Sequence, residues 1–177
     1  AKVADEAAIV TAVARATGDR PLEGRRVVVT AGATTESVDP IRTLSNRSSG
    51  RTGRAVARAC HVHGADVTLV HDGPGVHYAD IRRVESAAEM REATLAATEG
   101  ADALVAAAAV GDYTVERRPE KIRSGGTLTL ELRPTAKVVD AVREAHPDLP
   151  VVGFKAETAG DDAALVAAAR GLADRIG

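Results

Sequence analysis

Short apolar runs alternate with helical segments along most of this chain, and this alternation constrains the fold more than any other feature. The runs at 26–30 and 66–71 are short and rich in β-branched residues, so we expect them to be buried strands. The segment at 49–63 between them has its apolar residues on one helical stripe and ends at Gly64. Strand–helix alternation of this kind predicts an α/β fold with a Rossmann-like, doubly wound and mostly parallel sheet.

The alternation continues toward the C-terminus. A third strand is expected at 81–85 and a very alanine-rich fourth strand at 103–110. Ser86 and Glu89 form a capping box at the start of the helix between these strands. The segment 127–132 alternates Thr and Leu with a period of two, which predicts a half-exposed strand. The remaining elements are expected as a buried strand at 150–154 and as helices at 5–17 with Asp5 as its cap, at 135–146 with Thr135 as its cap, and at 161–175.

The loop at 31–54 is the most unusual connection in the chain. It has about twenty residues, against the ~2–6 usual between a strand and its helix. Ser48 or Ser49 can cap the helix that follows, and the free N–H groups of its first turn would then face the carboxyl edge of the sheet. A phosphate gains there from the N–H donors and from the helix dipole. The ordinary alternative is a plain N-cap beside a Gly-rich turn.

Ligands bind outside the carboxyl ends of the strands in sheets of this kind, so polar residues at strand ends are candidates for a site. Asn46 carries an amide that can donate a hydrogen bond to a developing oxyanion. Asp112 can orient a base or support a metal, or simply cap a loop. Lys121 can reach a triphosphate as a point charge, or be a solvated surface cation. Phe154, the only Phe, suits packing on a nucleotide or in the core.

Composition limits the classes of partner. Aromatic residues make up 2% of the 177 residues and the net charge is −2, which argues against a nucleic-acid surface built on stacking or on basic charge. No apolar run approaches the ~18 residues of a membrane span and no signal peptide is evident, so we expect a cytoplasmic protein that does not bind membranes. The single Cys60 excludes an intrachain disulfide and a multi-cysteine zinc site.

Four stretches together resemble one family. They read T-A-G-A-T-T-E-S-V-D-P-I-R-T-L-S-N-R-S-S-G-R-T-G at 30–53, A-A-V-G-D-Y at 108–113, K-I-R at 121–123 and V-G-F-K-A-E-T at 152–158. This pattern is similar to that of phosphopantothenate–cysteine ligase, also called phosphopantothenoylcysteine synthetase, the ligase half of the bifunctional coenzyme A biosynthesis protein. The resemblance extends over about 24–158, and the segment 134–137 is closer to archaeal members.

The resemblance implies a reaction in two steps. The family activates the carboxylate of 4′-phosphopantothenate with CTP, which releases pyrophosphate, and L-cysteine then displaces CMP from the acyl-cytidylate to form an amide. Mg²⁺ is expected because a cation offsets the charge that moves onto the triphosphate. FMN belongs to the decarboxylase half of the bifunctional protein and not to this domain.

The resemblance also assigns roles to residues of this chain. Asn46 handles the acyl-cytidylate, Lys121 acts in cytidylyl transfer, and Arg42 acts with Asn46. The nucleotide-binding positions are Ala106, Ala107, Ala108, Asp112, Lys121, Val151, Val152, Gly153 and Phe154, and Asp112 is also the candidate Mg²⁺ ligand. The positions for phosphate and substrate are Gly32, Ser48, Ser49, Gly50 and Gly53.

The resemblance further divides the chain. Residues 1–23 are expected to be the tail of the preceding decarboxylase domain with a linker, and 24–177 the ligase domain, which lacks part of its C-terminal segment. The native protein would then be bifunctional. The family forms homodimers through β-structure near the loop of Lys121, so we expect a flap and a β-extension, including 127–132, to make that contact.

Two other functions stay open on the sequence alone. The segment 30–32, the glycines at 50 and 53 and the strand-end Asp72 imitate the dinucleotide fingerprint of an NAD(P)-dependent short-chain reductase. Against this, Tyr78 and Tyr113 are each followed four residues later by Arg, so the Tyr-x-x-x-Lys pair of such reductases is missing. The other alternative is an inactive nucleotide-binding fragment.

Overall fold

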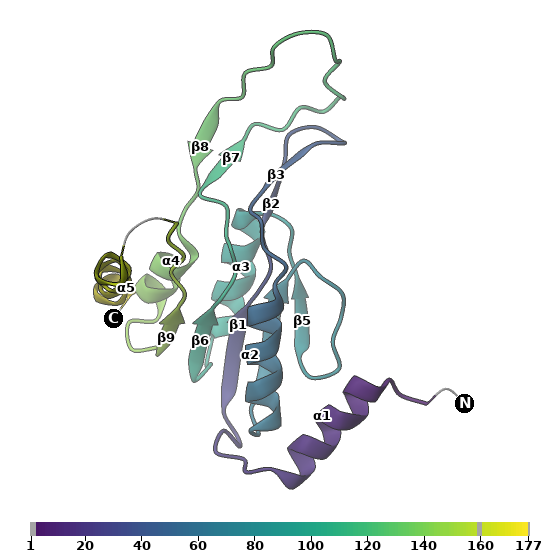
Figure 1. Ribbon diagram of the computed structural model, residues 1–177, viewed down its shortest axis with the longest axis vertical. Helices are drawn as coiled ribbons and strands as arrows, with labels where there is room; N and C mark the ends of the chain where they lie inside the picture. The colour runs from purple at the N-terminus through teal and green to yellow at the C-terminus, as the bar shows by residue number, and fades with distance from the viewer. Residues whose placement is uncertain (1–2, 159–160, 177) are drawn as a thin grey trace.

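A five-stranded parallel sheet forms the centre of the molecule (Figure 1). The computed structural model describes residues 3–158 and 161–176. The strands lie in the order β5-β4-β1-β6-β9, with helices on both faces, so the predicted α/β class and Rossmann-like sheet are confirmed. The strands of this sheet are β1 (Arg26–Thr30), β4 (Asp66–His71), β5 (Asp80–Arg83), β6 (Ala103–Ala106) and β9 (Val151–Gly153). The helices are α1 (Glu6–Thr17), α2 (Arg51–Val62), α3 (Ala87–Thr98), α4 (Val138–Ala145) and α5 (Asp162–Ile176).

The central strand, β1, is buried on both faces. It pairs in parallel with β4 on one side and β6 on the other. Val27 and Val29 pack with Ala57 of α2, whereas Val28 packs with Met90 of α3 on the opposite face. A run that is apolar at every position suits such a strand, because helices cover the sheet on both sides.

Two small antiparallel hairpins lie beyond the carboxyl edge of the sheet. The first, β2 (Thr35–Ser37) with β3 (Thr43–Ser45), lies inside the long loop after β1. The second, β7 (Tyr113–Val115) with β8 (Leu132–Pro134), is the base of a projecting segment that we call the arm, residues 113–134 (Figure 1). The second hairpin lies in the region expected to form a β-extension, although with different bounds, whereas the first is not predicted, because strands of three residues are too short to show a periodicity in sequence.

The strand predicted at 127–132 is wrong except at its last residue. Strand β8 begins at Leu132, and 127–131 form no strand. Leu128 is 45% exposed and Leu132 is 43% exposed, so neither packs in a core. Alternation of Thr and Leu becomes a strand only where another strand pairs with it, and the described residues pair only 132–134.

Helix α4 begins at Val138, not at Thr135 as predicted. Thr135 instead hydrogen-bonds to the loop that follows β6, because its N–H donates to the Asp112 carbonyl (3.0 Å) and its hydroxyl donates to the Gly111 carbonyl. The alanine-rich strand also ends early, at Ala106. The residues that follow therefore form a loop at the carboxyl edge of the sheet.

Helix α1 packs against α2. The Asp5 carboxylate accepts a hydrogen bond from the Ala8 N–H (2.9 Å), which confirms the predicted N-cap. The Arg15 guanidinium donates to the carbonyls of Gly64 (3.1 Å) and Ala65 (3.2 Å), just beyond the end of α2. No helix in residues 3–158 or 161–176 is long and apolar enough to span a membrane.

Candidate functional site

The N-terminus of α2 lies directly against the loop that follows β1. A Cβ atom added at Gly53 would come within 2.5 Å of the Ala31 Cβ, and one at Gly50 within 2.8 Å of the Gly32 backbone nitrogen. Gly32 and Gly50 also have φ angles of +86° and +66°, which favour glycine. Gly32, Gly50 and Gly53 are therefore brought together, and this close approach requires that Gly50 and Gly53 lack side chains.

The predicted serine cap of α2 is wrong. Gly50 is the N-cap, and no side chain in the described part of the chain caps this helix. Ser48 Oγ instead accepts a weak hydrogen bond from the Gly50 N–H (3.4 Å), and the Ser49 carbonyl accepts one from the Arg54 guanidinium (2.8 Å). A glycine in the left-handed conformation replaces the cap, which leaves the first-turn N–H groups available to an anion.

The loops after β1 and β6 run side by side. The Ala109 N–H donates to the Gly32 carbonyl (2.8 Å), and the Gly111 N–H donates to the Thr34 hydroxyl (2.8 Å). Thr34 is 1% exposed, so its hydroxyl is a fixed part of the backbone arrangement. The long loop and the alanine-rich loop, which are far apart in sequence, therefore form one surface.

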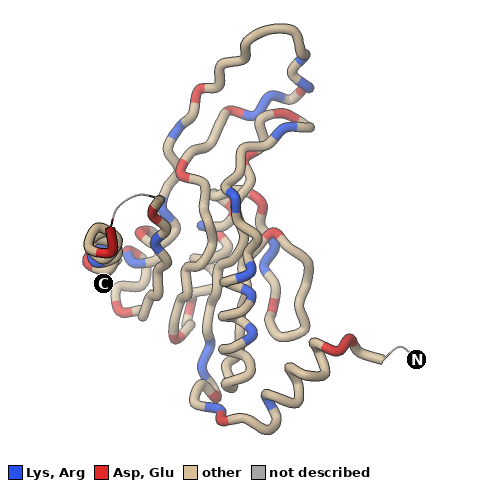
Figure 2. The backbone as a smooth tube through the Cα atoms, viewed as in Figure 1, with Lys and Arg blue, Asp and Glu red and all other residues tan. Residues whose placement is uncertain are grey.

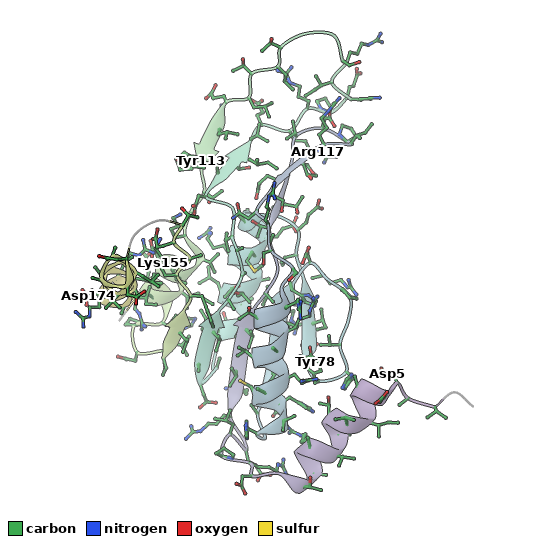
Figure 3. The ribbon with its side chains drawn as sticks, viewed as in Figure 1. Asp5, Tyr78, Tyr113, Arg117, Lys155 and Asp174 are labelled. Carbon is green, nitrogen blue, oxygen red and sulfur yellow. The ribbon has the colours of Figure 1, made fainter. Side chains whose placement is uncertain are left out.

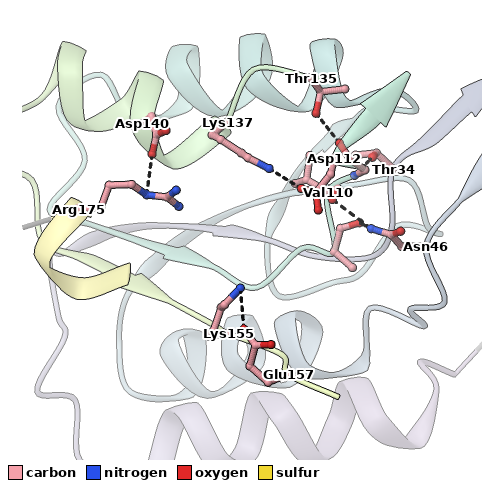
Figure 4. Close-up of polar contacts among 12 residues, drawn as sticks. Thr34, Asn46, Val110, Asp112, Thr135, Lys137, Asp140, Lys155, Glu157 and Arg175 are labelled. Carbon is pink, nitrogen blue, oxygen red and sulfur yellow. Dashed lines mark hydrogen bonds and ion pairs between the residues drawn. The ribbon is translucent and has the colours of Figure 1, made fainter. Parts of the chain in front are cut away.

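Asn46 lies where these two loops meet. Its side-chain amide donates hydrogen bonds to the carbonyls of Ala109 (3.3 Å) and Val110 (3.1 Å), as Figure 4 shows for Val110. Asn46 also lines a small pocket of about 170 Å³ together with Asp112 and Tyr113. This volume accommodates reacting groups rather than a whole nucleotide, since complete ligand pockets measure roughly 300–1,000 Å³.

Asp112 forms an ion pair with Lys137, the residue just before α4 (Figure 4). Both side chains are well exposed, so water screens the pair and leaves the carboxylate accessible. The contact of Lys137 with Asp112 is not predicted from the sequence. The position of Lys137 could have indicated a partner. A cation at a helix N-terminus interacts unfavourably with the helix dipole, so a nearby carboxylate is expected to compensate.

A second set of contacts joins the β2–β3 hairpin to the arm. The Asp39 carboxylate accepts hydrogen bonds from the N–H groups of Ile122 (3.0 Å), Ile41 (2.8 Å) and Arg42 (2.7 Å), and forms an ion pair with the Arg42 side chain. The Arg42 guanidinium also donates to the Ile122 carbonyl (3.0 Å). We call Asp39, Arg42 and Ile122 the clasp.

Asp39 is ionised in the clasp although it is buried. Burial raises the pKa of its carboxyl group, but hydrogen bonds from Ile122, Ile41 and Arg42 outweigh this effect and hold that pKa well below its usual range. Asp39 belongs to the long loop singled out by sequence, but its contact with the arm is not predicted. Its position two residues before Ile41, where an Asp can bond to nearby backbone N–H groups, was the available signal.

The structure separates the three residues expected to act in catalysis. Arg42 belongs to the clasp, and no hydrogen bond or ion pair in the described chain links it to Asn46. Lys121 lies on the arm and is exposed, with no such contact among the described residues. Figure 3 shows Arg117 well along the arm from Tyr113 and beside the first hairpin, and Figure 2 shows Lys and Arg gathered on this outer part.

The expected nucleotide-binding positions on β6 and β9 lie next to one another. Ala106 pairs directly with Gly153, and Ala107 and Ala108 continue from the end of β6. Val152 is 54% exposed and Phe154 is 53% exposed, so the interpretation of Phe154 as a core aromatic is wrong. Val151 instead contributes to the core through the cluster around Met90. Small residues and an exposed aromatic ring therefore meet at the carboxyl edge of the sheet.

Neither cavity size nor ligand clustering identifies the site. A larger cavity of about 450 Å³ is lined by Arg26, Asp66 and Ala97, near the amino ends of the strands and away from the candidate residues. No group of three or more His, Cys, Asp or Glu side chains within the described ranges could hold a metal. Asp112 alone fits Mg²⁺ that arrives with a nucleotide, because Mg²⁺ is often held by one or two carboxylates plus phosphates.

Comparison with known proteins adds independent evidence. Residues 22–175 match the family described as the DNA/pantothenate metabolism flavoprotein C-terminal domain. The whole chain is 44% identical to the coenzyme A biosynthesis bifunctional protein CoaBC of Thermococcus kodakarensis, covering 45% of that protein. It is 39% identical over 145 residues to the protein of the same name from Bacillus subtilis, covering 78% of this chain and 36% of that one. The chain thus spans less than half the length of these curated relatives.

A solved structure agrees with these sequence matches. The crystal structure of the C-terminal domain of coenzyme A biosynthesis bifunctional protein CoaBC superposes with a TM-score of 0.72 at 30% identity, covering 86% of this chain and 74% of that one. The family match includes every candidate site residue described above and argues against a short-chain reductase. The chain belongs to the family of the DNA/pantothenate metabolism flavoprotein C-terminal domain, which confirms the resemblance found in its sequence.

Proposed function

We propose that this chain joins 4′-phosphopantothenate to L-cysteine, with CTP as the co-substrate. The observation that carries the proposal is the position of Asn46, in a chain of this family, at the junction of the loops after β1 and β6. In the first step a carboxylate oxygen of phosphopantothenate attacks the α-phosphorus of CTP, and pyrophosphate leaves. In the second step the cysteine amine attacks the acyl carbon, CMP leaves, and the amine loses a proton as the amide forms.

Asn46 acts in the second step. Its amide already donates to two carbonyls, so its N–H groups are aimed by the fold toward oxygen acceptors at this edge. When substrate is bound, the same amide can donate to the oxygen that becomes negative as cysteine attacks the acyl-cytidylate. Because the amide has two N–H groups, one of them exchanges its backbone carbonyl for this oxygen while the other keeps the side chain in place.

Lys121 acts in the first step. It is an exposed cation on the arm, free among the described residues of any ion pair that would hold it elsewhere. Its ammonium group can neutralise charge on the triphosphate as pyrophosphate leaves. Arg42 then contributes through the backbone next to Lys121, where it donates to the Ile122 carbonyl, rather than through Asn46.

The nucleotide would lie across the carboxyl ends of β1, β6 and β9. The N-terminus of α2, with Gly32, Ser48, Ser49, Gly50 and Gly53 around it, offers backbone donors to a phosphate. Ala106 to Ala108 and Val151 to Phe154 offer a flat surface of small residues beside an exposed ring. Mg²⁺ would be held by Asp112 and the triphosphate, where it offsets the charge of the leaving group.

The relatives and the arm suggest two further features. The relatives named above are bifunctional, so we expect residues 1–23 to connect this domain to a decarboxylase that carries the FMN. We also expect a homodimer formed through the arm, whose Tyr113, Leu128 and Leu132 are exposed apolar side chains. Sedimentation of the protein before and after substitution of Leu128 by Asp tests the dimer, which should dissociate.

Product analysis tests the proposed reaction. The protein incubated with CTP, Mg²⁺, 4′-phosphopantothenate and L-cysteine should form phosphopantothenoylcysteine and CMP in equal amounts, measured by mass spectrometry. Omission of cysteine should prevent the amide but not the release of pyrophosphate. Binding of CTP with no turnover would support the inactive-fragment alternative instead.

A further inference from the structure

We infer that Asp39 is a positioning residue for Lys121, acting through the backbone of Ile122. The inference rests on the proposed function, because it takes from there the role of Lys121 in the first step. It concerns the clasp alone, in which Asp39 and Arg42 hold the peptide groups on both sides of Ile122, the residue that follows Lys121.

The Asp39 carboxylate does more than shape its own turn. Its Oδ1 atom accepts the N–H groups of Ile41 and Arg42, which is sufficient to fix the turn. Its Oδ2 atom is directed to the arm, where it accepts the Ile122 N–H (3.0 Å). The side chain is fully buried, and a buried carboxylate is costly unless it is paired and hydrogen-bonded. The hydrogen bond from the Ile122 N–H therefore helps to stabilise the buried negative charge of Asp39.

Arg42 completes the hold on the arm. Its guanidinium is ion-paired with Asp39 and donates to the Ile122 carbonyl (3.0 Å), so the N–H and the carbonyl of one residue are both held. A further hydrogen bond lies on the other side of Lys121, where the Arg118 N–H donates to the Val38 carbonyl (2.9 Å). The segment 118–122 is thus attached to the β2–β3 hairpin at both ends.

Lys121 is the exception within this held segment. Its backbone lies between the two attachment points, while its side chain is exposed and makes no hydrogen bond or ion pair with any described residue. Because the backbone of Lys121 is held, its long side chain can place the ammonium group on a triphosphate from a fixed Cα position. A displacement of about 1 Å at such a group can reduce a rate on the order of 100-fold.

The test is Asp39→Asn, which keeps one oxygen for the turn but replaces the acceptor for Ile122 with an amide. The kcat of pyrophosphate release should fall on the order of 10- to 100-fold, while the KM for CTP changes little. The double variant Asp39→Asn/Lys121→Ala should be no slower than Lys121→Ala alone, because Asp39 acts only through Lys121. Hydrogen exchange of the Ile122 amide, measured without substrate, should be faster in Asp39→Asn.

Asp102→Asn is the matched control. Asp102 also accepts a backbone N–H, from Arg26 (2.8 Å), and pairs with an arginine, Arg25 (2.9 Å), but at the amino ends of the strands. This variant should leave pyrophosphate release and Ile122 exchange unchanged. Two results would overturn the inference while the proposed function stands. One is a double variant whose loss of kcat equals the product of the losses in the two single variants. The other is an Ile122 amide that exchanges at the same rate in Asp39→Asn as in the unaltered protein. Absence of pyrophosphate release by the unaltered protein overturns the proposed function, and the inference with it.

Discussion

The side-chain amide of Asn46 donates a hydrogen bond to the backbone carbonyl of Val110 across 3.1 Å. This bond connects the end of the β2–β3 hairpin to the loop after β6, two segments that are far apart in sequence. It places the amide at the carboxyl edge of the sheet, in the pocket that Asp112 also lines.

Asn46→Ala should block amide formation and leave the first step intact. Removal of one oxyanion donor typically lowers a rate on the order of 10²- to 10³-fold, so the acyl-cytidylate should accumulate while pyrophosphate is still released. Rapid quenching followed by mass spectrometry measures the intermediate. Thr43→Ala, at an exposed position of the same strand and outside the pocket of Asn46, is the control, and unimpaired product formation in Asn46→Ala would rule out the role.

Lys121→Ala should stop the first step. Loss of a charge that stabilises the leaving pyrophosphate should lower its release at least about 100-fold, while binding of 4′-phosphopantothenate measured by calorimetry is retained. Arg123→Ala removes a cation two residues further along the arm and should be nearly silent. Equal decreases in pyrophosphate release in Lys121→Ala and Arg123→Ala would contradict a specific role for Lys121. They would show that the positive charges of the arm act only together.

Gly53→Ala should destabilise the fold because a methyl group there would meet the Ala31 side chain at 2.5 Å. Overpacking of this kind typically costs about 1–3 kcal/mol of unfolding free energy. Gly171→Ala lies within α5, where nothing is within 4 Å of an added Cβ, and should be neutral or stabilising by about 1 kcal/mol. Urea unfolding of both variants measures the difference, and a neutral Gly53→Ala would contradict the close approach of α2 to the loop after β1.

Asp112→Asn should raise the Mg²⁺ concentration needed for half-maximal pyrophosphate release, since the amide is a weaker ligand than the carboxylate. Its effect on stability should be under about 1 kcal/mol, because the pair with Lys137 is exposed. Lys137→Met should have an equally small effect on stability. A magnesium titration unchanged by Asp112→Asn would exclude Asp112 as a ligand.

Stability should depend on the ionisation of Asp39 at acid pH. Hydrogen bonds depress the pKa of this carboxyl group in the folded protein below the ordinary value of 3.8, so the folded state favours the charged form. The stabilisation is complete well above pH 4 and is lost as the pH falls through and below that value. The difference in unfolding free energy between the unaltered protein and Asp39→Asn should therefore shrink between pH 7 and pH 3. A constant difference would contradict an ionised Asp39 in the clasp.

The sheet could be predicted from sequence because its signals are local. Three consecutive valines in β1 predict a strand that is buried on both faces. Asp5 and Ser86 cap their helices as expected. Elements whose existence depends on distant partners were missed or misplaced. Thr135 looks like a helix cap, but its hydroxyl bonds to Gly111, more than twenty residues earlier, and the helix starts later.

The same contrast between local signals and distant contacts applies to the residues of the candidate site. Asn46 and Asp112 were identified because each has a recognisable chemical group at a strand end or in a long loop. The contacts of Asp39 with Ile122 and of Lys137 with Asp112 span 83 and 25 positions of sequence. A carboxylate that binds a backbone N–H so far away leaves no periodic or local pattern, so only the three-dimensional structure reveals the clasp.

Release of pyrophosphate from CTP, measured with and without 4′-phosphopantothenate and in the absence of cysteine, tests the central claim most directly. The proposed function predicts release from CTP only when phosphopantothenate and Mg²⁺ are present, with ATP and GTP as comparison nucleotides. No release from CTP under these conditions, or release that does not depend on phosphopantothenate, would contradict it.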